Sequence, residues 1–358
     1  MVQYIVRRFL VSIPVFFGIL FITFALARLI PGDPCRAQLG EHASDQVCDA
    51  FAERFGLNKP IPVQFGIYLS DVMRGDLGNS IRQGRPVTLI LIERLPVTVE
   101  LSMAAMLFAT AVGIPLGILS ARRRNSAVDV ATMVGANLGV STPVFVLGLL
   151  LEYLFAVILK DTVLWLPPSG RISSGILVPS LRQVWGLESW QGLAASALDF
   201  VSRLYLVNAV LTGNAELLLD TLRHLVLPAV AVGTIPLAII ARMTRSSMLE
   251  VLHLDFIRAA RAKGVPMRQV LLRHAFRNAL LPVVTVIGLS LGGLLSGAVL
   301  TETVFNLSGV GKTLFESITA RDYTVIQAFT LAVAFIYVGV NLFVDVVYVF
   351  LDPRIRLK

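Results

Sequence analysis

The chain has 358 residues, of which 56% are apolar and 15% are charged, and its formal net charge is +8. A soluble protein carries roughly a quarter charged residues, so this composition and a mean hydropathy of +0.77 exclude that class. The apolar residues fall in blocks of about twenty, the length with which a helix crosses a hydrocarbon layer of about 30 Å. The sequence therefore predicts an all-α membrane protein with several spans.

We expect six transmembrane helices, and their predicted ranges are 9–30, 97–120, 130–158, 224–242, 281–303 and 326–350. The first apolar run has about nineteen residues, whereas the core of a signal peptide has about 7–15. We therefore expect the first helix to be retained.

A seventh apolar segment, 190–211, is predicted not to cross the membrane. It carries Asp199 and Arg203 at i,i+4 spacing, which favours a surface pair on one amphipathic helix. Counting it as a span would also move the basic segment 242–277 to the other side of the membrane.

The positions of Lys and Arg predict the orientation, because short cytoplasmic segments carry an excess of both. Both termini, the turn at 122–124 and the loop at 242–277 are basic, and we expect all of them to be cytoplasmic. Topology and attraction to anionic lipid therefore explain the net charge. We expect the lipid bilayer, and no nucleic acid, as the partner of these cations.

The remaining segments, 31–96, 159–223 and 304–325, are rich in turn-forming Pro and Gly, and we expect them to form an irregular periplasmic cap. We divide the chain into an N-terminal segment with the first helix (1–30), a periplasmic segment (31–96) and a membrane core (97–358). The core includes an insertion at about 160–222 and a cytoplasmic loop at about 245–282.

The only two cysteines, Cys35 and Cys48, lie in the first predicted periplasmic segment. An oxidising compartment favours a disulfide between them, worth about 3 kcal/mol in the loop-entropy account. Two free thiols are the alternative.

Residues 307–313 read LSGVGKT and resemble the end of a phosphate-binding loop, G-x-x-x-x-G-K-[ST], but Asn306 stands where the first glycine belongs. The segment is predicted to lie outside and lacks the strand-then-helix setting that such a loop requires. We interpret it as a turn, and we expect the chain to bind no cofactor and to have no catalytic residue or metal site.

The predicted spans contain small residues and a few carboxylates. Gly288, Gly292, Gly293 and Gly297 form two small-xxx-small pairs, which are typical of close helix packing or of a pathway between helices. Of the carboxylates, Glu100 lies at the outer end of its span, Glu152 in the outer half and Asp345 near the inner end. Most therefore lie near the predicted membrane interfaces, which favours structural roles over the coupling role of a proton relay.

The most informative segment is 245–284, which is predicted to form two short helices joined at Gly264-Val265-Pro266. Glycine suits the position after a helix that requires φ > 0, and proline suits the first turn of the next helix. The result is a bent helix–turn–helix that either lies on anionic lipid or docks into a cytoplasmic protein.

This segment resembles the "EAA" coupling loop of ABC importer permeases, whose pattern is E-A-A-x3-G followed by L-P. The chain departs from that pattern in having an arginine in place of the glutamate and in a longer gap before the L-P pair. Both departures are usual in the peptide-importer branch, where the motif reads R-x-A-R-A-K-G. The corresponding residues are Arg258, Ala259, Ala260, Arg261, Ala262, Lys263, Gly264, Leu281 and Pro282.

The resemblance covers nearly the whole chain and is least typical over 160–222. The matching stretches, LIPGDP, GDLGNS, GIPLGIL, LPPSGR, ARMTRSSMLEVL, LTETVFNLSGVGK and DPRIR, resemble the B-type permease of dipeptide and oligopeptide importers. The resemblance implies a bacterial inner-membrane subunit that pairs with a C-type permease and with two ATP-binding subunits, which use ATP and Mg²⁺. A periplasmic or lipid-anchored substrate-binding protein would deliver the cargo.

Other functions stay open at this point. The same class of importer takes glutathione, nickel complexes or peptide-like antibiotics. A stand-alone secondary transporter would need coupling carboxylates in mid-membrane, and a membrane enzyme would need a catalytic cluster; the sequence favours neither.

Overall fold

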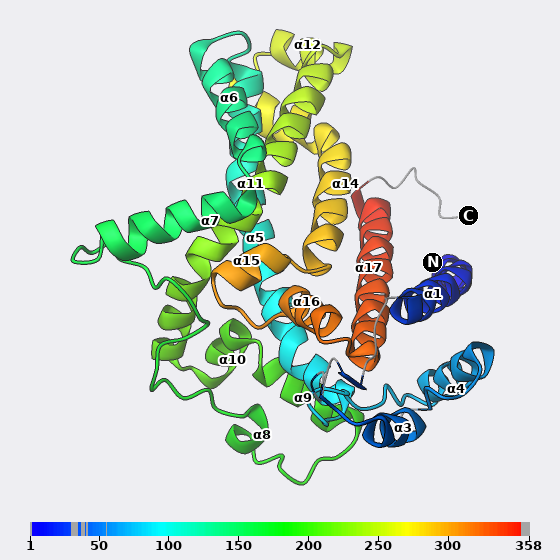
Figure 1. The fold of residues 1–358 in the computed structure, drawn as a ribbon. Helices are drawn as coiled ribbons and strands as arrows, with labels where there is room; N and C mark the ends of the chain where they lie inside the picture. The colour runs from blue at the N-terminus through cyan, green and yellow to red at the C-terminus, as the bar shows by residue number, and fades with distance from the viewer. Residues whose placement is uncertain (1, 30–34, 37–39, 41, 55, 352–358) are drawn as a thin grey trace.

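The computed structural model describes residues 2–29, 35–36, 40, 42–54 and 56–351. Regular structure in this part of the chain is helical, apart from an isolated β-bridge between Asn79 and Pro86. Figure 1 shows long helices between an end that carries the short helix α12 (Asp255–Ala262) and an opposite end that carries α9 (Leu193–Ser202). We call these the α12 end and the α9 end.

Five helical segments are long and apolar enough to cross a membrane by themselves, and each overlaps one of the predicted spans. They are α1 (Val2–Leu29), α5 (Val87–Arg122), α11 (Ala215–Leu252), the continuous run of α13 (Met267–Gln269), η2 (Val270–Ala275) and α14 (Phe276–Leu295), and α17 (Tyr323–Leu351). At about 1.5 Å per residue, several of these helices are longer than the hydrocarbon layer requires, so their ends continue beyond the predicted spans.

The third predicted span, 130–158, is not one continuous helix. The chain forms α6 (Ala127–Ser141), then α7 (Val144–Glu152) with its continuation η1 (Tyr153–Ile158), and the two parts are bent by 100°. The break lies at Pro143, which has no N–H to donate and holds the preceding residue in an extended conformation. The pair is either a broken span or a re-entrant segment.

The fifth predicted span, 281–303, extends too far. Helix α14 ends at Leu295, Gly297 adopts a left-handed φ of 99°, and a separate helix, α15 (Val299–Val304), follows. A positive φ ends a right-handed helix and is open mainly to glycine.

The apolar segment at 190–211 forms two short helices, α9 and α10 (Tyr205–Thr212), bent by 95°. The predicted pair of Asp199 and Arg203 is wrong. Asp199 lies 3.4 Å from a guanidinium nitrogen of Arg182, and Arg203 lies 3.6 Å from a carboxylate oxygen of Glu93. Because the turn at 203–204 ends α9, the two side chains are not on consecutive turns of one helix.

The shorter helices pack around the α9 end and along the bundle. They are α3 (Asp45–Arg54), α4 (Ile61–Met73), α8 (Leu181–Val184) and α16 (Val310–Thr319). The stretches LIPGDP and DPRIR, with the basic C-terminus, lie mostly or wholly outside the described residues.

The centre of the fold is the crossing of α5 and α11, where glycines bring the two backbones together. A Cβ atom on Gly117 of α5 would lie 2.5 Å from Cβ of Thr244, and one on Gly233 of α11 would lie 2.8 Å from the carbonyl oxygen of Ala105. Both distances are too short for real Cβ contacts. The glycines are therefore required for this packing, as small residues are in membrane helix pairs.

Candidate functional site

The helix α12 ends in the turn that its sequence predicts. The N–H of Val265 donates to the carbonyl of Ala260 (3.2 Å), and the N–H of Gly264 donates to that of Arg261 (3.0 Å). This pair of bonds is a Schellman motif, and Gly264 occupies its left-handed position with φ 75°. A Cβ atom there would meet nothing within 4 Å, so only the backbone conformation selects glycine.

The side of α12 that faces the bundle is fixed by one apolar residue. Ile257 is fully buried and packs in a cluster with Met248 of α11, Val270 of η2 and Ala121 of α5. Three long helices therefore hold α12 in place through this cluster.

The other side of α12 is exposed and combines cations with apolar side chains. Arg258, Arg261 and Lys263 are exposed, as are the small residues Ala259 and Ala262, whereas Ala260 is half-buried. Larger apolar side chains lie beside them, with Phe256 42% and Met267 40% exposed. A surface of this kind suits a protein partner better than bulk water, because exposed apolar patches mark interaction sites.

Leu281 and Pro282 do not belong to this surface. Both lie inside α14, where Leu281 is half-buried and Pro282 is exposed. The structure therefore separates the second part of the motif from its first part.

A buried carboxylate, which the sequence analysis did not single out, joins three elements at the α12 end. Asp129, at the start of α6, accepts two hydrogen bonds from Arg245 of α11 (2.7 and 2.8 Å) and one from the backbone N–H of Asn125 (2.9 Å). It also accepts a short hydrogen bond from Ser120 of α5. Ser126 followed three residues later by Asp129 is a helix-start pattern that marks the position in the sequence.

The four glycines predicted for packing or for a pathway divide between two environments. A Cβ atom on Gly288 would lie 2.2 Å from Val344 of α17, and one on Gly292 would lie 2.9 Å from Tyr337, so these two pack α14 against α17. Gly297 packs on the backbone of α16. Gly293 is exposed and has open space around it.

Gly293 faces an apolar cavity of about 440 Å³. The cavity lies between four helices, and its lining residues include Val144 of α7, Pro236 of α11, Ser290 of α14 and Leu300 of α15. Its lining includes Val144, directly after the break at 142–143, and Ala298, in the break at 296–298, so the cavity lies beside both places where predicted spans are interrupted.

The segment LSGVGKT leads into the helix α16 rather than ending as a turn. The anion bound at the start of this helix is a carboxylate of the same chain, that of Glu302. Residues 310–313 begin α16, whose Lys312 N–H donates to the carboxylate of Glu302 at 2.8 Å. Glu302 is fully buried and also accepts the hydroxyl of Thr98 at 2.7 Å, which in turn accepts the Val310 N–H at 2.8 Å. The donors that would hold a phosphate are thus already bound.

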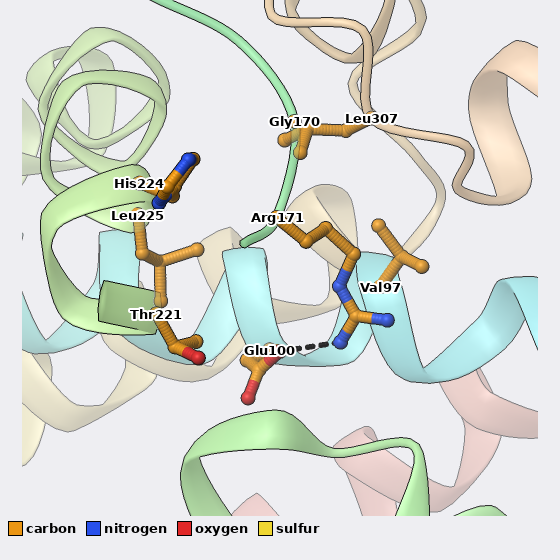
Figure 2. Close-up of a pocket in the computed structure, with 8 residues that line it drawn as sticks. All are labelled: Val97, Glu100, Gly170, Arg171, Thr221, His224, Leu225 and Leu307. Atoms are coloured by element: carbon orange, nitrogen blue, oxygen red, sulfur yellow. Dashed lines mark hydrogen bonds and ion pairs between the residues drawn. The ribbon is translucent and has the colours of Figure 1, made fainter. Parts of the chain in front are cut away.

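A third buried carboxylate fixes the loop between η1 and α8 (Figure 2). Glu100 of α5 accepts a guanidinium N–H of Arg171 at 2.6 Å and the backbone N–H of Leu206 at 2.6 Å. Arg171 also lies over the ring of Tyr205, 3.7 Å from its centroid. Glu100 therefore has the structural role that was predicted for it, and Asp345 has one as well, because it lies 3.1 Å from Arg8.

Cys35 and Cys48 are joined by a disulfide with a Cα–Cα distance of 5.4 Å. Cys35 is buried and Cys48 belongs to α3. The bridge fastens α3 to the chain that follows the first helix.

Two family comparisons cover nearly the whole chain. The family described as "Binding-protein-dependent transport system inner membrane component" matches residues 113–357. The family of the N-terminal part of such membrane components matches residues 1–102.

Individual relatives are similar over their full length. The dipeptide transport system permease protein of Alkalihalophilus pseudofirmus is 44% identical over 99% of this chain and 100% of its own. The di/tripeptide transport system permease protein of Pseudomonas aeruginosa is 43% identical over 99% of each chain, and the dipeptide permease of Escherichia coli is 42% identical over 100% of each.

Proposed function

Because the chain belongs to the family of inner membrane components of binding-protein-dependent transport systems, we propose that it forms half of the membrane pathway of a dipeptide importer. The chain is a permease subunit of a peptide ABC importer. Dipeptides or short oligopeptides are the proposed cargo, because the full-length relatives carry dipeptide or di/tripeptide in their names. The proposed location is the bacterial inner membrane, with the α12 end in the cytoplasm.

The proposed complex has four kinds of subunit. A C-type permease pairs with this chain, two ATP-binding subunits bind at the α12 ends, and a substrate-binding protein delivers peptide at the α9 end. ATP and Mg²⁺ belong to the ATP-binding subunits, and this chain binds neither. The disulfide between Cys35 and Cys48 would form in the oxidising outer compartment.

The observation that carries this proposal is the α12 surface. It pairs a buried anchor, Ile257, with exposed Ala259 and Ala262 on a helix that ends in a defined turn at Gly264. Small exposed residues allow close approach of a partner, while the anchor transmits its movement to α5, α11 and α14. ATP can bias the pathway only if the partner contacts α12 differently in the two states.

The test is uptake into proteoliposomes that contain all the proposed subunits. We expect labelled dipeptide to accumulate only when ATP and the substrate-binding protein are both present. A single cysteine at Ala259, in a background that keeps the native disulfide, should cross-link to an ATP-binding subunit. The same cysteine placed at Thr319 of α16, exposed near the α9 end, should not. Uptake without the ATP-binding subunits would contradict the proposal and favour a secondary transporter.

A further inference from the structure

A polar cavity of about 860 Å³ lies at the α9 end, between α3, α4, the loop at 76–84 and the start of α17. Figure 1 shows α3 and α4 beside the end of α17 at which that helix begins. The volume falls within the range of small-molecule sites, about 300–1,000 Å³. The contacts described above leave this cavity without a role.

The walls of the cavity are held by fixed contacts. Asp322 accepts the backbone N–H groups of Ile81 and Arg82, both at 3.1 Å, and the hydroxyl of Ser80, which fastens the loop to the start of α17. The disulfide fastens α3, and the ring of Phe24 on α1 packs against Phe65 of α4 with centroids 5.1 Å apart. The cavity is therefore largely formed before any ligand arrives.

The charged groups of the lining favour a cationic ligand. Among the lining residues that the structure describes, three carboxylates, those of Glu53, Asp71 and Asp76, accompany one ammonium, that of Lys59. Asp76 accepts the N–H of Gly78 at 2.8 Å. Within the part of the chain that the structure describes, Asp71 and Glu53 form no ion pair, although the chain as a whole is strongly basic.

An unpaired amide adds a second requirement. Gln327 of α17 lines the cavity and is 5% exposed, and its Nε2 has no hydrogen-bond partner among the described residues. A buried donor without an acceptor destabilises the folded protein, and a carbonyl oxygen of a ligand would satisfy it. Apolar side chains such as Phe51 and Ile67 complete the lining.

We propose that this cavity binds the N-terminal end of a short peptide, with its ammonium group at Asp71 and its first carbonyl at Gln327. An ammonium, an adjacent carbonyl and an apolar side chain are the groups that the lining complements, and together they define a peptide N-terminus. The inference rests on the proposed function. It adds a site on the permease itself, at the end where peptide is delivered.

The test uses the full-length chain in lipid nanodiscs, without the other subunits, and isothermal titration with alanyl-phenylalanyl-alanine. We expect binding of the free peptide and about tenfold weaker binding of its N-acetylated form, because acetylation removes a charge-assisted hydrogen bond. Asp71→Asn should weaken binding of the free peptide by a similar factor. The matched control is Glu316→Gln, an exposed carboxylate on α16 outside the lining, which should leave binding unchanged.

Lys59→Gln tests whether misfolding explains the weaker binding of the Asp71→Asn variant, because Lys59→Gln should raise the affinity for the free peptide instead of lowering it. Removing this cation, the one among the described lining residues, should strengthen peptide binding about threefold, which a damaged protein would not do. Equal binding of free and acetylated peptide, or no effect of Asp71→Asn, would overturn the inference.

Two further outcomes separate this inference from the proposed function. If the assembled complex imports dipeptide but the chain alone binds none, the inference fails and the function stands. If Asp71→Asn weakens binding of the substrate-binding protein while peptide does not bind, the cavity takes a segment of that protein, and the inference also fails. If the chain binds the peptide as expected but the complete complex imports none, the proposed function fails instead.

Discussion

The two ends of the helical bundle use charged side chains in opposite ways. At the α9 end, buried carboxylates are bound within the chain: Glu302 to the start of α16, Glu100 to Arg171, and Asp322 to the loop at 80–82. On α12, Arg261 and Lys263 are exposed and form no ion pair with any residue that the structure describes. Charge directed inward fixes irregular loops, whereas charge left outward stays available to a partner.

This contrast predicts which property each end controls. A substitution among the bound carboxylates of the α9 end should lower stability, because buried groups lose their partners. A substitution on the exposed surface of α12 should leave the chain folded and weaken its binding to the ATP-binding subunits.

The largest effect is expected for Glu302→Ala. It leaves the N–H of Lys312 and the hydroxyl of Thr98 without their buried acceptor, which should cost about 3–5 kcal/mol of unfolding free energy. The measurement is the thermal unfolding midpoint of the purified chain. Glu316→Ala, on an exposed position of the neighbouring helix α16, should leave the midpoint nearly unchanged; equal midpoints for both variants would contradict the prediction.

Asp129→Ala tests whether the contrast has an exception, since this carboxylate lies buried at the α12 end. The substitution removes the acceptor of Arg245 and Ser120 and should cost about 2–3 kcal/mol. Asp255→Ala, an exposed carboxylate on α12 itself, is the control and should cost under about 1 kcal/mol. A stable Asp129→Ala variant would show that these hydrogen bonds between α6, α11 and α5 contribute little to the free energy of unfolding.

Gly264→Val tests whether the α12 end controls binding of the ATP-binding subunits independently of the stability of the chain. The left-handed φ of 75° makes a side chain cost about 1–2 kcal/mol, and the change should displace α12 without touching the spans. We expect the partner permease to bind normally, while co-purification of the ATP-binding subunits and substrate-stimulated ATP hydrolysis fall several-fold.

A matched control exists at the other end. Gly186 has φ 66° and, like Gly264, has nothing within 4 Å of an added Cβ. Gly186→Val should carry the same backbone cost and leave ATP hydrolysis unchanged. If both variants lose hydrolysis equally, the effect belongs to backbone strain in general and α12 has no special role.

The smallest effect is expected for Lys312→Ala. Its ammonium group donates to the exposed side chain of Asn306 at 2.8 Å, a contact worth under about 1 kcal/mol. ATP-driven transport by the complex should continue at its normal rate. Nucleotide binding by the isolated chain that disappears on this change would show that LSGVGKT is a phosphate site after all.

The sequence predicts best where the physical cause is local. The turn after α12 follows from Gly264 and Pro266 alone, because a left-handed position and a helix start each need one particular residue type. Most spans could likewise be predicted, because the apolar composition of a segment alone decides whether it is long and apolar enough to cross the membrane. Pro143, however, stands inside an apolar block, and membrane helices often keep a proline without breaking, so composition could not foresee the 100° bend.

The hydrogen-bond partners of the buried carboxylates could not be predicted from the sequence for a different reason. Glu302 and Thr98 are 204 residues apart in the chain, and Asp129 and Arg245 are 116 apart. Nothing in a single sequence pairs such positions. The expected pair of Asp199 and Arg203 fails because it assumed a continuous helix where the chain turns.

The helix α11 runs without interruption from the base of α12 to the α9 end, a length of about 57 Å at 1.5 Å per residue. One of its close contacts with α5, at Gly233, lies at its midpoint, and another, at Thr244, lies nearer to α12. If α11 tilted about this midpoint, its two ends would move in opposite directions. A tilt of about 5° would carry each tip roughly 2–3 Å, in opposite directions. An inward displacement of α12 would then be accompanied by an outward displacement of the other end of α11. A pathway that opens alternately to the two sides of the membrane requires such opposite displacements.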